Sequence, residues 1–287
     1  MTTGPRLAWF RGAVRPLAEC GVSLLDRGLL FGESIYEVLP VVAGRVRLVA
    51  QHMQRMRSGA AAIGIEALPA DDEVEALAAA LCEGEGLDEG ILYLQVTGGA
   101  GPARAHVAPA TDPTFFGFVQ AVAMPRADAL ASPLSVSTAF DPRWARSELK
   151  TTMLLPSVLA RRHAGAADEV VFFDPDGRLT EGGASSVFIV EGGRVVMPPL
   201  TPRVLPSVTR ALLDDLAPRA SIAVHRETID RARLVAADEI AVASTTKLVL
   251  PVGRVDGQAV AFRTDGVIAT LAAQLRERYG LAPTRDA

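Results

Sequence analysis

The chain of 287 residues is short of lysine, cysteine and histidine, and the shortages of cysteine and histidine argue against particular kinds of site. The two cysteines, Cys20 and Cys82, stand in no CxxC pattern, so neither a disulfide framework nor a zinc cluster is predicted. We expect both thiols to be buried in a reducing compartment. The four histidines never occur at HxxxH or HxH spacing, which argues against a metal site.

Long apolar runs and an excess of positive charge are missing as well. Runs such as LVLPV are too short to cross a bilayer, and the start, MTTGPRLAWFRG, lacks the basic-then-apolar layout of a secretory signal. The formal net charge of −4 argues against a nucleic-acid partner. We therefore expect a cytoplasmic protein that binds neither membranes nor nucleic acids.

The pattern of apolar residues and turns predicts an α/β (α+β) chain. Helices are predicted over residues 48–64, 70–86, 154–166, 208–217 and 264–280. Strands are predicted over 6–10, within 33–49 as two strands that meet at Ala43-Gly44, and over 91–99, 113–125, 134–140, 240–245 and 248–252. Hairpins are predicted over 169–181 and 185–198. Because hairpins replace regular βαβ alternation, we expect sheets with helices packed on them.

The length is large for one compact domain, so one large or two modest domains are expected. Around MPRADALASP, proline, alanine and aspartate interrupt the apolar runs. We interpret residues 121–133 as a linker between a smaller N-terminal domain, 1–120, and a C-terminal domain, 134–287.

Several familiar catalytic motifs are absent. The sequence contains no GxxxxGK[ST] and no GxSxG, so it has neither a P-loop nor a nucleophile elbow. Gly99-Ala-Gly101 follows a predicted strand but lacks the third glycine of a dinucleotide fingerprint.

Lysine occurs only at Lys150 and Lys247, whereas the other 27 basic residues are arginines. Arginine can replace lysine as a surface charge, but it cannot replace an amine that forms a Schiff base with a carbonyl. A lysine that persists in an arginine-rich chain is therefore a candidate nucleophile. On composition alone, two ordinary surface lysines remain the simpler interpretation.

The segments around the lysines supply the parts that a pyridoxal phosphate site needs. A helix that begins at Ser207, Val208 and Thr209 offers free backbone amides for a phosphate group. Glu181, which ends a hairpin strand beside two glycines, could face the pyridine nitrogen, and Ser-Thr-Thr at 244–246 could offer hydroxyls. Helix capping by Ser207 and an ordinary turn acid at Glu181 are the alternatives.

Seven stretches in sequence resemble the fold-type IV pyridoxal-phosphate enzymes, the superfamily of the class IV aminotransferases. They are LLDRGLLFGESIYE, QHMQRM, GPARAH, RWARSELKTTMLL, RLTEGGASSVF, LPSVTR and ASTTKLVLPV. The resemblance implies a smaller N-terminal and a larger C-terminal α/β domain with pyridoxal 5'-phosphate between them. It also implies a homodimer in which a loop of the neighbouring subunit completes each active site.

The resemblance also implies roles for single residues. Lys150 corresponds to the Schiff-base lysine that shuttles the proton, and Glu181 to the partner of the pyridinium nitrogen. Arg143 lies where the family places a residue near the phenolic oxygen of the cofactor. The implied phosphate site consists of Arg55, Ser207, Val208, Thr209 and Thr245. The implied substrate contacts are Tyr36, Val38, Arg104, His106, Ala184, Ser185 and Thr246. Lys247 is interpreted as an ordinary side chain beside the phosphate segment.

Within the superfamily, the D-amino acid aminotransferases are the most similar branch. Tyr36, Arg104 and His106 match the residues with which that branch binds the α-carboxylate of the substrate, and PRWARSELK is also nearest to it. The implied reaction transfers an amino group from a D-amino acid to a 2-oxo acid such as pyruvate or 2-oxoglutarate, with side activity on (R)-amines. The alternatives are aminodeoxychorismate lyase and, after it, branched-chain L-amino acid aminotransferase.

Overall fold

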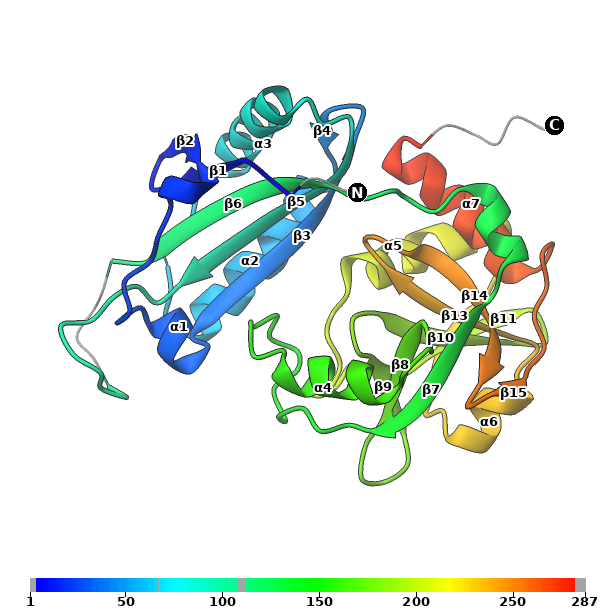
Figure 1. The fold of residues 1–287 in the computed structure, drawn as a ribbon. Helices are drawn as coiled ribbons and strands as arrows, with labels where there is room; N and C mark the ends of the chain where they lie inside the picture. Colours follow the sequence, from blue (N-terminus) through cyan, green and yellow to red (C-terminus); the bar gives the residue numbers. More distant parts are fainter. Residues whose placement is uncertain (1–3, 67, 108–111, 282–287) are drawn as a thin grey trace. The chain divides into compact units, whose positions relative to one another are not determined.

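The computed structural model describes residues 4–66, 68–107 and 112–281 (Figure 1). The chain forms two compact units. Unit 1 consists of residues 1–124 and the short segment 149–153, and unit 2 consists of residues 125–148 and 154–287. The segment 149–153 contains Lys150, so this lysine belongs structurally to the N-terminal unit although it lies far along the sequence.

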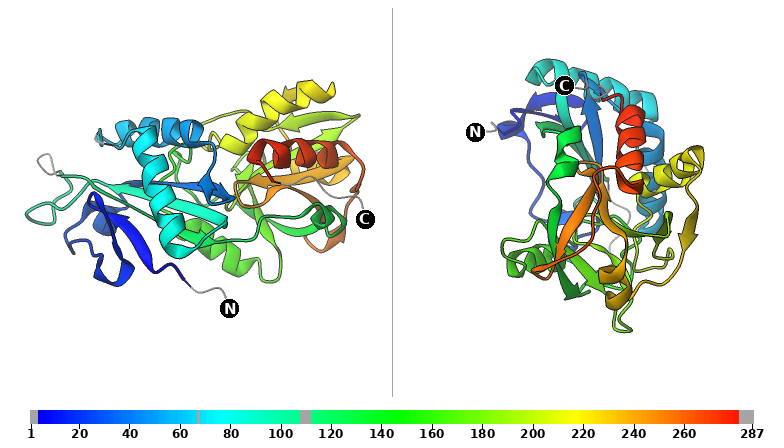
Figure 2. Two further views of the ribbon diagram at one scale, coloured as in Figure 1. Left: turned by 90° about the horizontal axis from the view of Figure 1, so that it is seen from above. Right: turned by 90° about the vertical axis from the view of Figure 1, so that its right-hand side faces the viewer.

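Unit 1 is an antiparallel sheet of six strands in the order β2-β1-β6-β5-β3-β4. The strands are β1 (Leu7–Phe10), β2 (Ala13–Pro16), β3 (Ser34–Val42), β4 (Arg45–Val46), β5 (Glu89–Thr97) and β6 (Thr114–Ala121). The helices are α1 (Arg27–Phe31), α2 (Val49–Ala62) and α3 (Asp71–Glu85), with the single turn η1 (Leu17–Glu19). Apolar residues of α2 and α3 form one core with the sheet, which agrees with the predicted helices. Figure 2 shows the backbone of this unit from two further sides.

The core of unit 1 follows the two-residue period of its strands. Ile35 and Leu39 of β3 lie in this core with Met53 and Met56 of α2, whereas Tyr36 on the alternate face is only half-buried. One face of β3 is therefore committed to packing, and the other is available for a site.

Unit 2 contains a nine-stranded sheet in the order β12-β11-β10-β13-β14-β7-β8-β9, with β15 paired to β14. The strands are β7 (Leu134–Phe140), β8 (Glu169–Phe173), β9 (Leu179–Gly182), β10 (Ser186–Glu191), β11 (Arg194–Met197), β12 (Val224–Arg226), β13 (Glu239–Ser244), β14 (Leu248–Val255) and β15 (Gln258–Ala259). The helices are α4 (Leu155–His163), α5 (Val208–Leu216), α6 (Arg231–Ala236) and α7 (Val267–Tyr279), with the short turns η2 (Ala127–Ala131) and η3 (Ala217–Ala220).

The sheet of unit 2 contains parallel pairs of strands in addition to the hairpins expected from the sequence. The predicted hairpins β8–β9 and β10–β11 are present and antiparallel, and β13 and β14, predicted as separate strands, form a further antiparallel pair. However, β7 pairs in parallel with both β8 and β14, and α4 connects β7 to β8 as a crossover helix. Helices α5 and α7 pack on β13 and β14.

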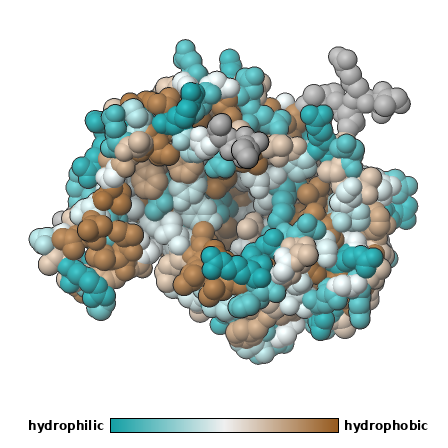
Figure 3. All heavy atoms as spheres, in the orientation of Figure 1, coloured by the Kyte–Doolittle hydropathy of each residue, from teal (hydrophilic) through white to brown (hydrophobic). Residues whose placement is uncertain are grey.

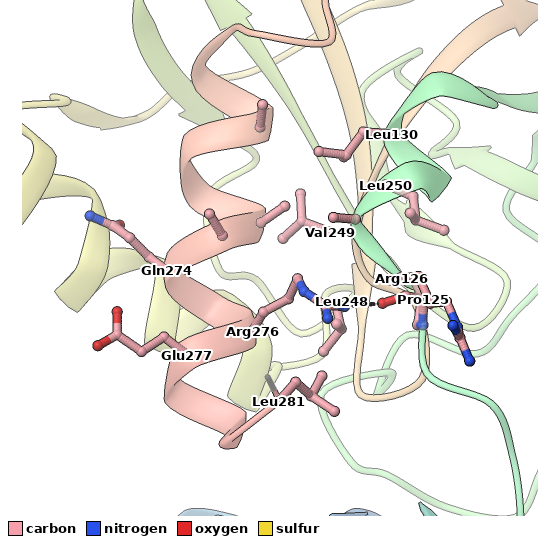
Figure 4. A pocket seen from close by; sticks show the side chains of 14 residues that line it. Pro125, Arg126, Leu130, Leu248, Val249, Leu250, Gln274, Arg276, Glu277 and Leu281 are labelled. Carbon is pink, nitrogen blue, oxygen red and sulfur yellow. Dashed lines mark hydrogen bonds between the residues drawn. The ribbon is translucent and has the colours of Figure 1, made fainter. Parts of the chain in front are cut away.

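A cavity of about 470 Å³ lies in unit 2 between α7, β14 and η2 (Figure 4). Leu130, Val249 and Arg276 face it, and none of the residues that line it belongs to the predicted site.

Two further expectations concern the cysteines and the membrane. Cys82 is buried as predicted, but Cys20, which directly follows η1, is only half-buried. Among the described residues, no helix is both long and apolar enough to cross a membrane.

Gly117 tests the packing of the unit 1 sheet, because it stands in β6 directly opposite Leu94 of β5. A Cβ atom at Gly117 would lie 2.6 Å from Cδ2 of Leu94 and 2.8 Å from the carbonyl oxygen of Tyr93. Gly117→Ala is therefore expected to lower the free energy of unfolding by ~1–3 kcal/mol in urea titrations. Gly21→Ala is the control, since a Cβ there meets nothing within 4 Å, and an equal loss in both variants would contradict the packing argument.

Candidate active site

Lys150 is fixed against the beginning of β3. The amide of Tyr36 donates to the carbonyl oxygen of Lys150 at 3.0 Å, and Thr151 forms an isolated antiparallel bridge with Ile35. The hydroxyl groups of Ser34 and Thr152 also contact each other. The Nζ atom of Lys150 lies 4.3 Å from the centroid of the Tyr36 ring, within the range of a cation–π contact. Two residues predicted separately from distant motifs are thus brought together.

The alternation of β3 places Val38 on the same face as Tyr36. Both residues are half-buried, and Val38 stands opposite Tyr93 of β5. The rings of Tyr36 and Tyr93 are stacked, with centroids 5.7 Å apart. This face of β3 therefore presents an aromatic surface beside the amine of Lys150.

Arg55 is bound to a buried carboxylate that the sequence analysis did not identify. Its Nε and Nη2 atoms donate to the two oxygens of Glu37, both at 2.7 Å. Glu37 is fully buried on the core face of β3, and it also contacts Nδ1 of His52 at 2.7 Å. Burial alone would raise the pKa of Glu37, but the guanidinium of Arg55 and the bond with His52 outweigh it and hold the pKa at about 2. An ionised Glu37 thereby fixes the guanidinium plane of Arg55.

His52 is a neutral histidine with a defined tautomer. Because the Glu37 carboxylate can only accept, Nδ1 of His52 must carry the proton. Its Nε2 is buried and has no hydrogen-bond partner among the described residues. Burial lowers the pKa of His52 below its ordinary value of 6.5, despite the nearby carboxylate.

The loop that contains Arg104 and His106 is organised around Phe31. The guanidinium of Arg104 lies 5.2 Å from the Phe31 ring centroid, and the His106 ring lies 5.5 Å from it. Arg27 holds the loop by donating to the carbonyl oxygens of Ala105 at 2.8 Å and His106 at 2.9 Å. Within the described part of the chain, neither side chain makes a hydrogen bond or ring contact with Tyr36.

In unit 2, Glu181 is buried and bound to Arg143. Nη1 of Arg143 donates to Oε1 of Glu181, while its Nε and Nη2 donate to the two oxygens of Asp141 at 2.9 and 2.7 Å. Asp141 is itself buried and accepts from the hydroxyl of Thr180 at 2.9 Å. Burial raises the pKa of Asp141, but the bonds from Arg143 outweigh it and lower the pKa overall. Asp141, which sequence reasoning missed, thus holds the arginine that contacts Glu181.

Glu181 also reaches the segment that leads into α5. Its Oε2 accepts from the amide of Leu205 at 3.1 Å. Ser207 caps α5 by accepting from the amide of Arg210 at 3.3 Å, as one of the two sequence interpretations proposed. Val208 and Thr209 form the first turn, where a helix has no carbonyl group to receive their amide protons. The carboxylate of Glu181 is therefore hydrogen-bonded to the segment that leads into the predicted phosphate site.

The two glycines after Glu181 are explained by packing within unit 2. A Cβ at Gly182 would lie 2.3 Å from Oγ of Ser185, and one at Gly183 would lie 2.7 Å from Cγ1 of Val170. Ala184, predicted as a substrate contact, is exposed at this turn.

Thr245 and Thr246 lie in the three-residue turn between β13 and β14, followed by Lys247. Lys247 is not the ordinary side chain expected from the sequence. Its Nζ atom lies 2.8 Å from Oε2 of Glu169, a carboxylate that is 1% exposed. The hydroxyl of Ser185 donates to the same oxygen at 3.0 Å. Three predicted contacts, Thr245, Thr246 and Ser185, are therefore connected through one ion pair.

Comparison with known proteins identifies the family of this arrangement. The sequence model of the family described as amino-transferase class IV matches residues 34–255. The chain belongs to this family. It is 29% identical to the D-alanine aminotransferase of Bacillus licheniformis over 253 residues, which cover 88% of this chain and 89% of that protein. It is also 29% identical to the D-alanine aminotransferase of Staphylococcus aureus (strain MSSA476) over 264 residues, covering 91% and 92%.

Solved structures of class IV relatives share the fold of this aminotransferase. The branched-chain aminotransferase of the archaeon Thermoproteus uzoniensis with norvaline has a TM-score of 0.84 at 21% identity, covering 97% of this chain and 96% of that one. A putative 4-amino-4-deoxychorismate lyase from Legionella pneumophila has a TM-score of 0.79 at 19% identity, covering 91% and 97%. At these identities the likeness establishes the fold and leaves the substrate open.

The sequence signals that could have revealed the buried carboxylates Glu37, Asp141 and Glu169 of this aminotransferase differ in strength. Glu37 interrupts the apolar alternation of Ile35, Leu39 and Val41 on the core face of β3, which indicates a buried and paired charge. Its partners in α2 are three residues apart and so share one side of that helix. Asp141 and Glu169 carry no comparable signal, because nothing local in the sequence marks them as buried. Among the described residues, no group of three or more histidine, cysteine, aspartate or glutamate side chains could hold a metal ion.

The lowered pKa of His52 predicts that the stability of the fold depends on pH. The pKa of His52 lies below 6.5 in the folded chain. As the pH falls below about 6.5, His52 is therefore protonated in the unfolded chain before it is protonated in the folded chain. Stability should therefore fall by up to about 1.4 kcal/mol per pH unit there, and fall further from about 4.5 toward 2 as Glu37 is protonated.

His52→Gln is expected to abolish the first loss in urea titrations between pH 7 and 5, because the amide of glutamine can still donate to Glu37 and does not titrate. His163→Gln removes an exposed histidine and serves as the control. An unchanged slope in the His52 variant would show that another group causes the loss.

Proposed function

We propose that this class IV aminotransferase transfers the amino group of a D-amino acid to a 2-oxo acid, pyruvate or 2-oxoglutarate, with side activity on (R)-amines. The observation that carries the proposal is the loop of Arg104 and His106, which Arg27 and Phe31 hold in a defined conformation. Guanidinium and imidazole on one ordered loop suit the α-carboxylate of an amino acid. The relatives named D-alanine aminotransferases support the same substrate class.

The cofactor is pyridoxal phosphate, and the residues present fit it. Glu181 is a buried carboxylate that accepts from Arg143, and a carboxylate is a suitable partner for a protonated pyridine nitrogen. The first turn of α5 offers the amides of Val208 and Thr209 to a phosphate group. Thr245 adds a hydroxyl, and Arg55 a guanidinium that Glu37 holds in place.

When bound, pyridoxal phosphate supplies an aldehyde that takes up the amino group and a ring that accepts electrons from the Cα atom of the substrate. Lys150 would hold this aldehyde through its Nζ atom. The same Nζ, once free, would accept the proton of the substrate Cα atom and donate it again. Tyr36, whose ring contacts Nζ, limits the directions in which the amine can move.

Arg143 and Asp141 have a supporting role in this scheme. Asp141 accepts from Arg143 through both of its oxygens and so fixes the plane of the guanidinium that donates to Glu181. Glu181 is thereby held in one position, in which it could pair with the pyridine nitrogen. We propose that Arg143 orients Glu181, in addition to its expected position near the phenolic oxygen.

We also propose that the enzyme is a homodimer in which the loop of Arg104 completes the site of the neighbouring subunit. Large apolar side chains remain at the surface around α1, with Leu24 81% and Leu29 59% exposed (Figure 3). Apolar side chains left in water favour association with a second copy.

The reaction itself is tested by following the visible spectrum of the enzyme through a half-reaction. D-alanine should convert the pyridoxal form to the pyridoxamine form, L-leucine should react at least tenfold more slowly, and (R)-1-phenylethylamine should react weakly. Lys150→Arg is the matched control, because it keeps the charge but should lose the visible band and turnover. Faster conversion with L-leucine would favour a branched-chain enzyme, and pyruvate release from aminodeoxychorismate would favour the lyase.

Arg104→Ala should weaken turnover of D-alanine by about tenfold to a hundredfold and spare (R)-1-phenylethylamine, which has no carboxylate. Equal losses on both substrates would refute carboxylate binding.

Hybrid dimers of Lys150→Ala and Arg104→Ala subunits, purified through two different tags, test the shared site. They should show about half of the wild-type activity if Arg104 acts in the neighbouring subunit, and only about half of the reduced Arg104→Ala activity if it acts in its own.

A further inference from the structure

Glu169 is a buried carboxylate with three partners and no part in the proposed chemistry. It begins β8 and is 1% exposed. Its oxygens accept from the amide of Val170 at 3.0 Å, from the hydroxyl of Ser185 at 3.0 Å and from Nζ of Lys247 at 2.8 Å. Removal of this ammonium group would leave a negative charge in a nearly dry environment.

The turn that carries Lys247 has an unfavourable backbone conformation at its end. Ser244 of β13 pairs with Leu248 of β14, so that only Thr245, Thr246 and Lys247 connect the two strands. Leu248 has φ = 53°, in the left-handed region that side chains with a Cβ atom rarely adopt. Such a conformation persists only where the surroundings hold it. Within the turn, the amide of Lys247 donates to the hydroxyl of Ser244 at 3.0 Å.

We propose that Lys247 is a positioning residue for the cofactor phosphate. Its ion pair with Glu169 ties the turn of Thr245 and Thr246 to β8, and the bond from Ser185 to the same oxygen ties in the segment after Glu181. The pair thereby holds the strained turn in one conformation and places Thr245 where it meets the phosphate group. This inference rests on the proposed function, because it assigns Thr245 to a bound pyridoxal phosphate.

The proposal distinguishes two ligands that differ only in the phosphate group. Apoenzyme of the full chain is titrated with pyridoxal 5'-phosphate and with pyridoxal, and both dissociation constants are measured by absorption. Lys247→Gln should weaken pyridoxal 5'-phosphate about tenfold, the effect of one hydrogen bond to a charged group, and change pyridoxal less than about threefold. Lys247→Arg keeps the charge and should restore most of the affinity.

Two further variants separate positioning from stability. Glu169→Gln removes the charge from the other side of the pair and should weaken pyridoxal 5'-phosphate in the same selective way. In the double variant Glu169→Gln and Lys247→Gln no charge is left buried, so it should fold even where Lys247→Gln alone does not. Its loss of affinity should be no larger than that of either single variant, because one interaction is removed only once.

The outcomes that overturn the proposal are specific. If the variants weaken both ligands equally, Lys247 stabilises the fold without positioning the phosphate site. Unchanged affinity for pyridoxal 5'-phosphate in Lys247→Gln would also refute it. Both results require a wild-type protein that binds pyridoxal 5'-phosphate; a wild-type protein that does not bind it would refute the proposed function instead.

Discussion

A carboxylate removed from water must either pair with a cation or give up its charge, and three buried carboxylates of this chain meet that requirement in the same way. Glu37 pairs with Arg55, Glu181 with Arg143 and Glu169 with Lys247. In each pair, at least one member either belongs to the cofactor or substrate site that the family resemblance implies, or is the neighbour in sequence of a residue that does. The geometry of the candidate site therefore depends on charge pairs within the protein.

These pairs are better understood as devices for position than as sources of stability. The free energy lost when two charges leave water can exceed their attraction, so a buried pair contributes little to net stability, whereas breaking one is costly. A side chain bound at two points also loses its rotational freedom before the ligand arrives. Arg55, with two nitrogens on Glu37, and Arg143, with two on Asp141, are both held in this way. Binding then spends less free energy on ordering the site.

The predictable part of the structure is the part encoded locally. The helices α2, α3, α5 and α7 follow their apolar stripes, and the hairpin β8–β9 follows its Asp-Pro-Asp-Gly turn. The short elements β2, α1 and α6 were missed because four to six residues carry too little pattern. The pairing of Lys150 with β3 and of Lys247 with Glu169 could not be predicted from spacing, since each contact joins residues far apart in the chain. Motif resemblance identified Lys150, but only the fold reveals that Tyr36 lies beneath its amine.

The two lysines of this arginine-rich chain have two different physical roles. Lys150 is required because an amine must form and break a covalent bond, which a guanidinium cannot do. Lys247 has no such duty, and its ammonium group instead neutralises a buried carboxylate through one short contact. Composition alone treats the two residues as equivalent, and motif resemblance dismisses the second. Burial of the partner distinguishes Lys247 from a surface lysine, because a positive charge opposite a buried carboxylate must be kept, whether lysine or arginine supplies it.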